Sequence, residues 1–324
     1  MSAVYFDMRK TGRTAAAAHL TGRDQRPQHA SRGELKFAMR NLAEAGRKRG
    51  GGGVKIGSQK HRASAISASN PQTIVVRGFD LCRDLIGQIT FTDHLWLLVT
   101  GTLPNATQRR VVDAALVAIA EHGLVPSVAA SRITLAAAPE ALQGAVAAGI
   151  LGCGSVILGS AEAAARFFTG IVARTASGPV DGAARAALSE LRETRRAIPG
   201  YGHPLHKVLD PRVERLLQVA TETGVAARHV EVARAVEKLL PEVTGKPLVM
   251  NVSGAIAAVL LDCGYPLLAV KGIPILARTA SLIAHLLEEQ ERPIGFVLAH
   301  SAVSDIGYDG ESPAGFVPGD DTQE

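Results

Sequence analysis

Residues 198–212, IPGYGHPLHKVLDPR, decide how the chain is organised around its functional region. Pro199, Gly200 and Gly202 prevent a regular helix, so the segment up to Gly202 is expected to form a shaped loop. His203 follows the last glycine and can point from this loop into a cleft. The stretch therefore predicts an imidazole that is presented by a loop.

A helix is expected to begin shortly after this loop. Asp210 suits the N-cap and Pro211 suits the first helical position, which places Arg212 on the first turn. An imidazole exchanges protons near neutral pH, and a guanidinium can bind a carboxylate through two hydrogen bonds. The pair His203 and Arg212 suits a substrate that bears a carboxylate and an oxygen atom that gains or loses a proton. On spacing alone, a glycine-rich loop with an incidental histidine would explain the same residues.

PGYGH, with DPR ending nine residues after the histidine, resembles the signature loop of the citrate synthase superfamily. Short members like this chain look closest to the citryl-CoA lyase branch, and the loop also resembles that of the C-terminal module of ATP-citrate lyase. The resemblance implies an all-α fold with a short β-element near the start of the core. It assigns residues 51–165 and 270–300 to a large helical domain, and residues 166–269 to a smaller inserted domain that carries the signature loop. Substrate would bind in the cleft between them.

Further segments match the family. Residues 120–123, AEHG, resemble the step whose histidine donates a hydrogen bond to the thioester oxygen of the acetyl-CoA enolate, so this role falls on His122. Residues 276–285, LARTASLIAH, resemble the helix whose arginine binds a substrate carboxylate, so this role falls on Arg278, although Ser281 stands where a glycine is usual. The alternatives are a helix-end histidine favoured by the helix dipole and a surface arginine on an apolar helix.

Arg292-Pro293 resembles a terminal motif whose arginine reaches the active site of the neighbouring subunit, which implies a homodimer. A solvated charge run would explain the same residues. For coenzyme A, the family uses groups around the signature loop, so His206 and Lys207 are candidates.

One position departs from the family pattern. The catalytic carboxylate of the family lies in a segment like NVDG, whereas this chain has NVSG at residues 251–254, so Ser253 occupies the expected Asp position. A hydroxyl is a far weaker base than a carboxylate. Asp262 lies about two and a half helical turns further on, and Glu121 is expected to point elsewhere. Water or a histidine then handles the proton, or the reaction differs, or catalysis is lost.

The resemblance implies an acyl-CoA carbon–carbon lyase that cleaves citryl-CoA, or a related 3-hydroxy-acyl-CoA, to acetyl-CoA and oxaloacetate by a retro-Claisen step. Arg212, Arg278 and Arg292 would bind the carboxylates, and His203 would handle the proton on the keto or hydroxyl oxygen. The alternatives are a citrate or 2-methylcitrate synthase that works in the condensing direction, and a non-catalytic homologue that binds coenzyme A or carboxylates. The coenzyme A thioester is a substrate, and no separate cofactor is implied.

The composition agrees with a helical enzyme. The chain has 324 residues, of which 47% are hydrophobic and only 4% aromatic, and alanine dominates the apolar positions. The start of the chain lacks the apolar core of a signal peptide, and uninterrupted apolar runs are too short to span a membrane. The three cysteines form no CxxC pair. We therefore expect a soluble cytoplasmic protein.

No metal site is expected, because His61, His94, His203 and His206 have no convincing partner set in the sequence.

Charge is unevenly distributed along the chain. Residues 1–62 hold 14 Lys and Arg against 4 Asp and Glu, a net charge of +10, so the remainder carries −5. A basic arm could bind nucleic acid, but a disordered extension over residues 1–50 is the preferred interpretation. Residues 301–324 hold six acidic residues and no Lys or Arg, which predicts a disordered acidic tail.

Short strands are expected within residues 54–77, and apolar periodicity predicts helices after them. The expected helices cover residues 79–88, 92–100, 107–122, 126–138, 139–151, 160–171, 183–196, 211–223, 228–240, 247–262 and 272–289.

Overall fold

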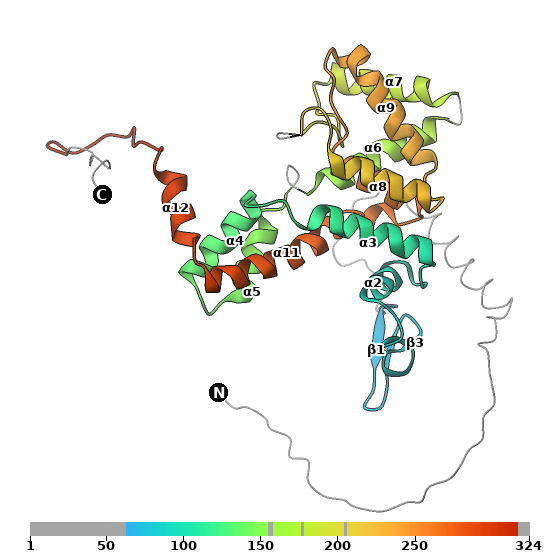
Figure 1. The fold of residues 1–324 in the computed structure, drawn as a ribbon, viewed down its shortest axis with the longest axis horizontal. Helices are drawn as coiled ribbons and strands as arrows, with labels where there is room; N and C mark the ends of the chain where they lie inside the picture. Colours follow the sequence, from blue (N-terminus) through green and yellow to red (C-terminus); the bar gives the residue numbers. More distant parts are fainter. Residues whose placement is uncertain (1–62, 155–157, 176–177, 204–205, 317–324) are drawn as a thin grey trace, which may run out of the picture. The chain divides into compact units, whose positions relative to one another are not determined.

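The computed structural model describes residues 63–316 except 155–157, 176–177 and 204–205, and it is mostly helical (Figure 1). The helices are α2 (Phe91–Thr100), α3 (Ala106–Ala120), α4 (Pro126–Ala137), α5 (Leu142–Leu151), α6 (Ser160–Arg174), α7 (Val180–Glu193), α8 (Pro211–Glu222), α9 (Arg228–Thr244), α10 (Val252–Asp262), α11 (Gly272–Glu291) and α12 (Gly295–Val303). The all-α class with a short β-element is confirmed. The arm predicted for residues 1–50 lies outside the described residues.

A small antiparallel sheet precedes the helices. It is formed by β1 (Ser67–Ser69), β2 (Ile74–Val76) and β3 (Phe79–Asp80), in that order. The helix predicted for residues 79–88 is wrong, because β3 pairs with β2 and only one π-helical turn, η1 (Leu81–Leu85), follows. Gly87, at φ +76°, turns the chain soon after that helix.

Several helix limits differ from the predicted ones for local reasons. α2 begins at Phe91 rather than at residue 92, because Thr90 caps the helix and forms a reciprocal capping box with Asp93. α10 begins at Val252 rather than at residue 247, because Met250 pairs with Tyr201 in a β-bridge before Asn251 caps the helix. α12 was not predicted, and it extends three residues into the segment predicted as a tail.

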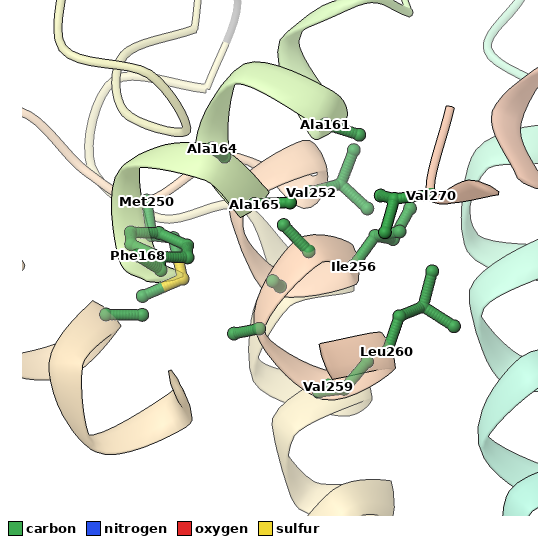
Figure 2. Packing of buried hydrophobic residues seen from close by; sticks show 14 of the residues in the cluster. Ala161, Ala164, Ala165, Phe168, Met250, Val252, Ile256, Val259, Leu260 and Val270 are labelled. Carbon is green, nitrogen blue, oxygen red and sulfur yellow. The ribbon is translucent and has the colours of Figure 1, made fainter. Parts of the chain in front are cut away.

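The core is built around α10. Every residue from Val252 to Leu260 is buried, and the helix packs against α3, α6, α8 and α9. Figure 2 shows Val252 and Ile256 of α10 in one hydrophobic cluster with Ala161 and Ala165 of α6. Small residues let the two helices approach closely, so the alanine-rich composition serves helix packing here.

The signature loop lies directly on the start of α10. A Cβ atom added at Gly254 would lie 2.6 Å from the carbonyl oxygen of Gly200. Glycine at both positions is therefore what allows the two backbones to meet, and this contact sets the position of the loop relative to the core.

α11 packs against α3, α4 and α5. With the 3₁₀ turn η3 (Leu267–Ala269) before it, the stretch Leu267–Glu291 is the one span in the described ranges whose length and composition would suit a membrane. It contains the buried polar residues Arg278, Ser281 and Glu289, as a core helix can. The division of the chain into a large and an inserted small domain stays a prediction.

Candidate active site

The signature loop is bound to the segment before α10 by hydrogen bonds. The Gly202 amide donates to the Val249 carbonyl at 2.8 Å, and the Asn251 amide donates to the Gly200 carbonyl at 2.9 Å. The Asn251 side-chain amide donates to the Gly202 carbonyl at 2.9 Å. Gly200 and Gly202 take φ values of +88° and +82°, which are unfavourable for residues with a Cβ atom. These contacts hold the point from which His203 emerges.

The rings of three half-buried histidines lie close together at this loop. The ring centroids of His203 and His206 are 4.6 Å apart, and His122 lies 5.6 Å from His203 and 5.8 Å from His206. His122 follows the C-terminus of α3, so a residue about eighty positions away joins the loop. The sequence indicated roles for His122 and His203, but it did not predict that His206 would join them.

The pKa values of His122 and His203 are both below the ordinary histidine value. Burial is the main cause for each, and the nearby positive charge of Arg212 adds to it. Asp210 acts in the opposite direction on both rings, without cancelling the effect. Both imidazoles are therefore neutral at pH 7 and are suited to donate or accept hydrogen bonds rather than to carry charge.

These shifts predict how the free energy of unfolding depends on pH. Because the folded state protonates the two rings only at lower pH than the unfolded chain does, the unfolded chain binds more protons just below about pH 6.5. Stability should therefore fall as the pH is lowered from about 7 to about 5. We expect a His122→Gln/His203→Gln variant to show a shallower fall in urea unfolding experiments. A His300→Gln variant is the control, because His300 is exposed on α12. If the fall in stability with pH is as steep in the double variant as in the wild type, the attribution to His122 and His203 is contradicted.

Asp210 and Arg212 form an ion pair beside the histidines. Nε of Arg212 donates to Oδ1 of Asp210 at 2.9 Å, and Nη2 donates to Oδ2 at 2.8 Å. Asp210 is fully buried and also accepts the Arg212 amide as the predicted N-cap of α8. Burial alone would raise the pKa of Asp210, but the bonds from Arg212 outweigh it and the pKa is lowered. Among the described residues, Nη1 of Arg212 makes no hydrogen bond to Asp210, so it is the nitrogen left there for a ligand.

Arg278 is the most unusual side chain of the site. It is 3% exposed, and its Nε and Nη1 atoms are buried without a hydrogen-bond partner in the parts of the chain that the structure describes. Nη2 makes one long contact of 3.4 Å to the Ile119 carbonyl. The interpretation as a surface arginine is therefore wrong. An unpaired buried guanidinium is costly, so this arrangement is suited to an anionic ligand.

Arg278 faces the region of His122, whose pKa it helps to lower. Burial is also the main reason that its own pKa is lowered; the charge of Glu121 opposes this shift, and Arg212 adds repulsion. Positive charge thus gathers around the histidines. Among the main influences on the pKa values of His122 and His203, the one carboxylate is that of Asp210.

Ser253 lies in the first turn of α10 and is buried, with 8% of its surface exposed. Asp262, at the opposite end of α10, accepts the amides of Ala227, His229 and Val230 and pairs with the His229 ring at 2.8 Å. The expectation that Asp262 does not substitute for the missing carboxylate therefore has a structural basis.

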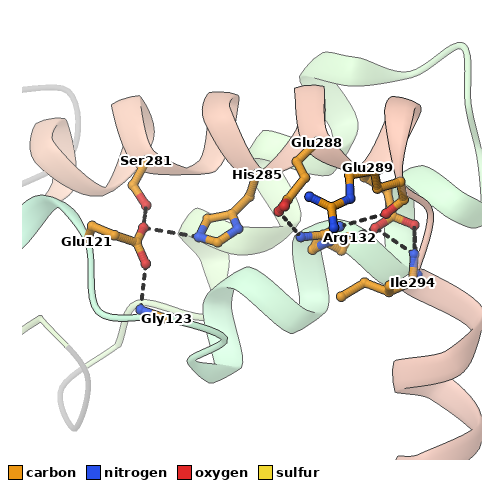
Figure 3. Close-up of polar contacts among 10 residues, drawn as sticks. Glu121, Gly123, Arg132, Ser281, His285, Glu288, Glu289 and Ile294 are labelled. Carbon is orange, nitrogen blue, oxygen red and sulfur yellow. Dashed lines mark hydrogen bonds and ion pairs between the residues drawn. The ribbon is translucent and has the colours of Figure 1, made fainter.

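Glu121 points toward α11 (Figure 3). Its carboxylate accepts from the Ser281 hydroxyl, from the Gly123 amide and from Nε2 of His285 at 3.0 Å. Burial would raise the pKa of Glu121, but these donors outweigh it and lower the pKa. Ser281, which replaces the usual glycine, thus helps to fix the helix end that carries His122. Sequence reasoning did not find this role.

The remaining predicted site residues are on the surface. Lys207 is exposed on the loop that carries His206, and Arg292 is exposed at the C-terminus of α11. The Arg292 carbonyl accepts from Nη2 of Arg132 at 3.2 Å, which fixes the backbone there. The roles of Lys207 in binding coenzyme A and of Arg292 in a partner subunit stay predictions.

The ligand atoms of the three histidines lie within 4.8 Å of one another, so they form a partner set that the sequence did not indicate. The chemistry of the set suits an anion better than a cation. Nδ1 of His203 already accepts the His206 amide at 3.0 Å, and Arg212 and Arg278 place positive charge beside the rings. A metal ion therefore fits these residues poorly.

The comparison with protein families agrees with this geometry. The model for the citrate synthase C-terminal domain matches residues 106–295. The chain belongs to the citrate synthase family. The matched range includes the three histidines, Arg212, Arg278 and Ser253, so the resemblance drawn from the signature loop is confirmed.

Two relatives illustrate the sequence similarity. Citrate/2-methylcitrate synthase of Bacillus subtilis is 27% identical over 206 residues, which cover 62% of this chain and 53% of that protein. ATP-citrate synthase subunit 1 of Sordaria macrospora is 27% identical over 251 residues, which cover 72% of this chain and 36% of that protein. The match thus spans about half of the first relative and about a third of the second.

Among solved structures, citryl-CoA lyase from Hydrogenobacter thermophilus is 32% identical with a TM-score of 0.69, and the match covers 79% of this chain and 97% of that one. ATP citrate lyase from Methanosaeta concilii, in complex with (3S)-citryl-CoA, has a TM-score of 0.65 at 21% identity, covering 91% and 47% of the two chains. The second likeness shows the fold alone.

Proposed function

We propose that this protein is an acyl-CoA carbon–carbon lyase that cleaves citryl-CoA, or a related 3-hydroxy-acyl-CoA, to acetyl-CoA and oxaloacetate by a retro-Claisen step. The observation that carries the proposal is Arg278, whose buried guanidinium has two nitrogens without a partner in the described residues. A substrate carboxylate would supply the missing acceptors and the missing negative charge. The likeness to citryl-CoA lyase over nearly the whole of that chain supports this substrate class.

The histidines have roles that follow from their neutral state. When the carbon–carbon bond breaks, its electron pair moves into the thioester to form an enolate, and His122 would donate a hydrogen bond to the oxygen that gains this charge. His203 would donate to the oxygen that becomes the keto group of oxaloacetate. Arg212 and Arg278 would hold the carboxylates, and their positive field would favour both developing charges.

A synthase working in the condensing direction is the first alternative. It is favoured by the similarity to citrate/2-methylcitrate synthase. Ser253 counts against it, because condensation begins with removal of a methyl proton that the usual carboxylate would accept. A homologue that binds the ligands without turnover is the second alternative, and it would keep Arg278 while lacking a base.

The assembly that we propose is a cytoplasmic homodimer in which Arg292 reaches the partner's site. In support, α11 and α12 carry exposed apolar side chains near Arg292, including Leu287 and Phe296. Exposed large apolar side chains close in sequence to a proposed interface residue suit contact with a partner subunit.

The direct test is a mass-spectrometric assay of the purified full chain with (3S)-citryl-CoA, and separately with acetyl-CoA plus oxaloacetate. We expect cleavage to acetyl-CoA and oxaloacetate, and we expect His203→Ala to lower kcat by about 10²- to 10⁴-fold. His300→Ala serves as the matched control. Net formation of citrate or citryl-CoA as the dominant activity would place the protein with the synthases, and no turnover in either direction would remove both activities.

A further inference from the structure

Cleavage of citryl-CoA moves a proton from an oxygen atom to a carbon atom. The tertiary hydroxyl loses its proton as the carbon–carbon bond breaks, and the departing enolate must gain a proton at its terminal carbon. Ser253 has no carboxylate with which to carry that proton. We propose that His206 carries it, an inference that rests on the proposed function.

The three carboxylates that could be considered as bases are already committed to other partners. Asp210 is held by two nitrogens of Arg212 and by its amide. Glu121 accepts from three donors, and Asp262 accepts from three amides and the His229 ring. The pKa of each of these three carboxyl groups is lowered, because its donors outweigh the effect of burial. Within the described ranges, these carboxylates are therefore weak bases fixed in structural roles.

His203 is arranged as a donor rather than as a base. Its Nδ1 accepts the amide hydrogen of His206 at 3.0 Å, so the neutral ring carries its hydrogen on Nε2. Such a ring can donate to the substrate oxygen, but it has no second lone pair to receive a proton. The charge of Arg278 also acts on His122, whose proposed role is that of donor to the thioester oxygen.

His206 is placed where the proton must be carried. Its ring centroid lies 4.6 Å from that of His203 and 5.8 Å from that of His122, the two groups that bind the reacting oxygens. It is half-buried on the loop after Gly202, and its own amide orients His203. Its ring therefore borders the position where the hydroxyl oxygen and the cleaved bond would lie.

One imidazole can serve both steps, because the hydroxyl oxygen and the departing carbon are attached to the same carbon atom. The neutral ring of His206 takes the hydroxyl proton. The O–H electron pair forms the keto group, the carbon–carbon bond breaks, and its electron pair becomes the enolate. The imidazolium then gives the same proton to the terminal carbon of the enolate, which yields acetyl-CoA and restores the neutral ring. The step needs no oxidant and no second acid.

The test compares variants in cleavage of (3S)-citryl-CoA by the full chain. We expect His206→Gln to lower kcat by about 10²- to 10⁴-fold with little change in KM. Ser253→Ala should retain activity within about threefold, since the hydroxyl is not the proton carrier. The double variant His206→Gln/Ser253→Asp should regain at least tenfold over His206→Gln, because it restores a carboxylate at the family's position. His300→Gln is the matched control.

Each outcome decides a separate point. Activity that survives His206→Gln in an active wild-type background overturns the role of His206 and leaves the proposed function intact. A loss that appears in KM alone indicates a coenzyme A contact and also overturns it. If His206→Gln is poorly folded by circular dichroism, recovery of His206→Gly activity by added imidazole is the deciding measurement, and a lack of recovery counts against the proposal. A wild-type protein without turnover in either direction removes the proposed function and this inference together.

Discussion

Replacement of Arg278 by Met is expected to make the ligand-free protein more stable while removing most of its activity. The guanidinium is 3% exposed, and two of its nitrogens have no hydrogen-bond partner in the described residues, so those residues leave a buried cation short of acceptors, although the charge of Glu121 acts favourably on it. Leaving a buried donor unsatisfied costs about 1 to 3 kcal/mol. Met is unbranched and apolar, so it can occupy much of the same space without that cost.

Activity should change in the opposite direction. Loss of one partner of a buried charge pair in a complex costs about 2 to 5 kcal/mol, which corresponds to a fall in kcat/KM of about 30- to 5,000-fold. The measurements are urea unfolding without ligand and the citryl-CoA assay. Arg215→Met, on an exposed position of α8, is the control and should change neither quantity. An Arg278→Met protein that is much less stable than wild type would mean that the guanidinium is compensated in the ligand-free state.

Opposite effects on stability and activity are what distinguish a binding residue from a structural one. A natural sequence keeps a destabilising side chain where the ligand, rather than the fold, needs it. Arg212 offers the contrast, since its charge is already balanced by Asp210 at 2.8 and 2.9 Å. The two arginines of the site therefore differ in kind, although sequence reasoning gave them the same role.

Local chemistry made much of the site predictable. Asp210-Pro211 predicted the start of α8, and Gly200 and Gly202 predicted the irregular loop, because these residue types act through their own backbone preferences. Apolar periodicity predicted most helices for the same reason. Where pairing with another segment decided the outcome, prediction failed, as at Phe79, which joins β2 instead of starting a helix.

The unpredicted parts of the site depend on contacts between distant residues. His122 meets His203 and His206 only after α3 and the loop are packed on α10. Ser281 binds Glu121 across 160 positions of sequence. No local pattern contains such pairs, so spacing could suggest each residue's chemistry but not its partners.

The largest effect on stability is expected at Arg132, which joins α4 to the end of α11. Its side chain is 2% exposed, and its Nε donates to Glu289 at 2.6 Å while its Nη1 donates to Glu288 at 2.7 Å (Figure 3). Nη2 donates to the Arg292 carbonyl. We expect Arg132→Met to lower the free energy of unfolding by about 3 to 5 kcal/mol, because it leaves the carboxylate of Glu289 buried without its counter-charge.

The companion variant Glu289→Gln separates charge from packing. Glu289 also accepts the amides of Ile294 and Gly295, and a glutamine oxygen can still accept them. The double variant Arg132→Met/Glu289→Gln should therefore be more stable than Arg132→Met alone by about 1 to 3 kcal/mol, since no buried charge remains. A double variant as unstable as the sum of its parts would mean that the two side chains do not interact energetically.

The pH dependence of stability is an independent test of the ion pair between Arg132 and Glu289. In the wild type, Arg132 and the two amides outweigh burial and lower the pKa of Glu289, so its contribution to stability is present above the unfolded value and is lost as the pH falls. Without Arg132, burial opposes the charged form, so stability should be lost at higher pH than in the wild type.

The same guanidinium fixes the backbone of Arg292, the residue proposed to reach the partner's site. Arg132→Met should therefore weaken citryl-CoA cleavage even at temperatures where the protein is fully folded, whereas Glu288→Gln, which removes only the exposed partner, should not.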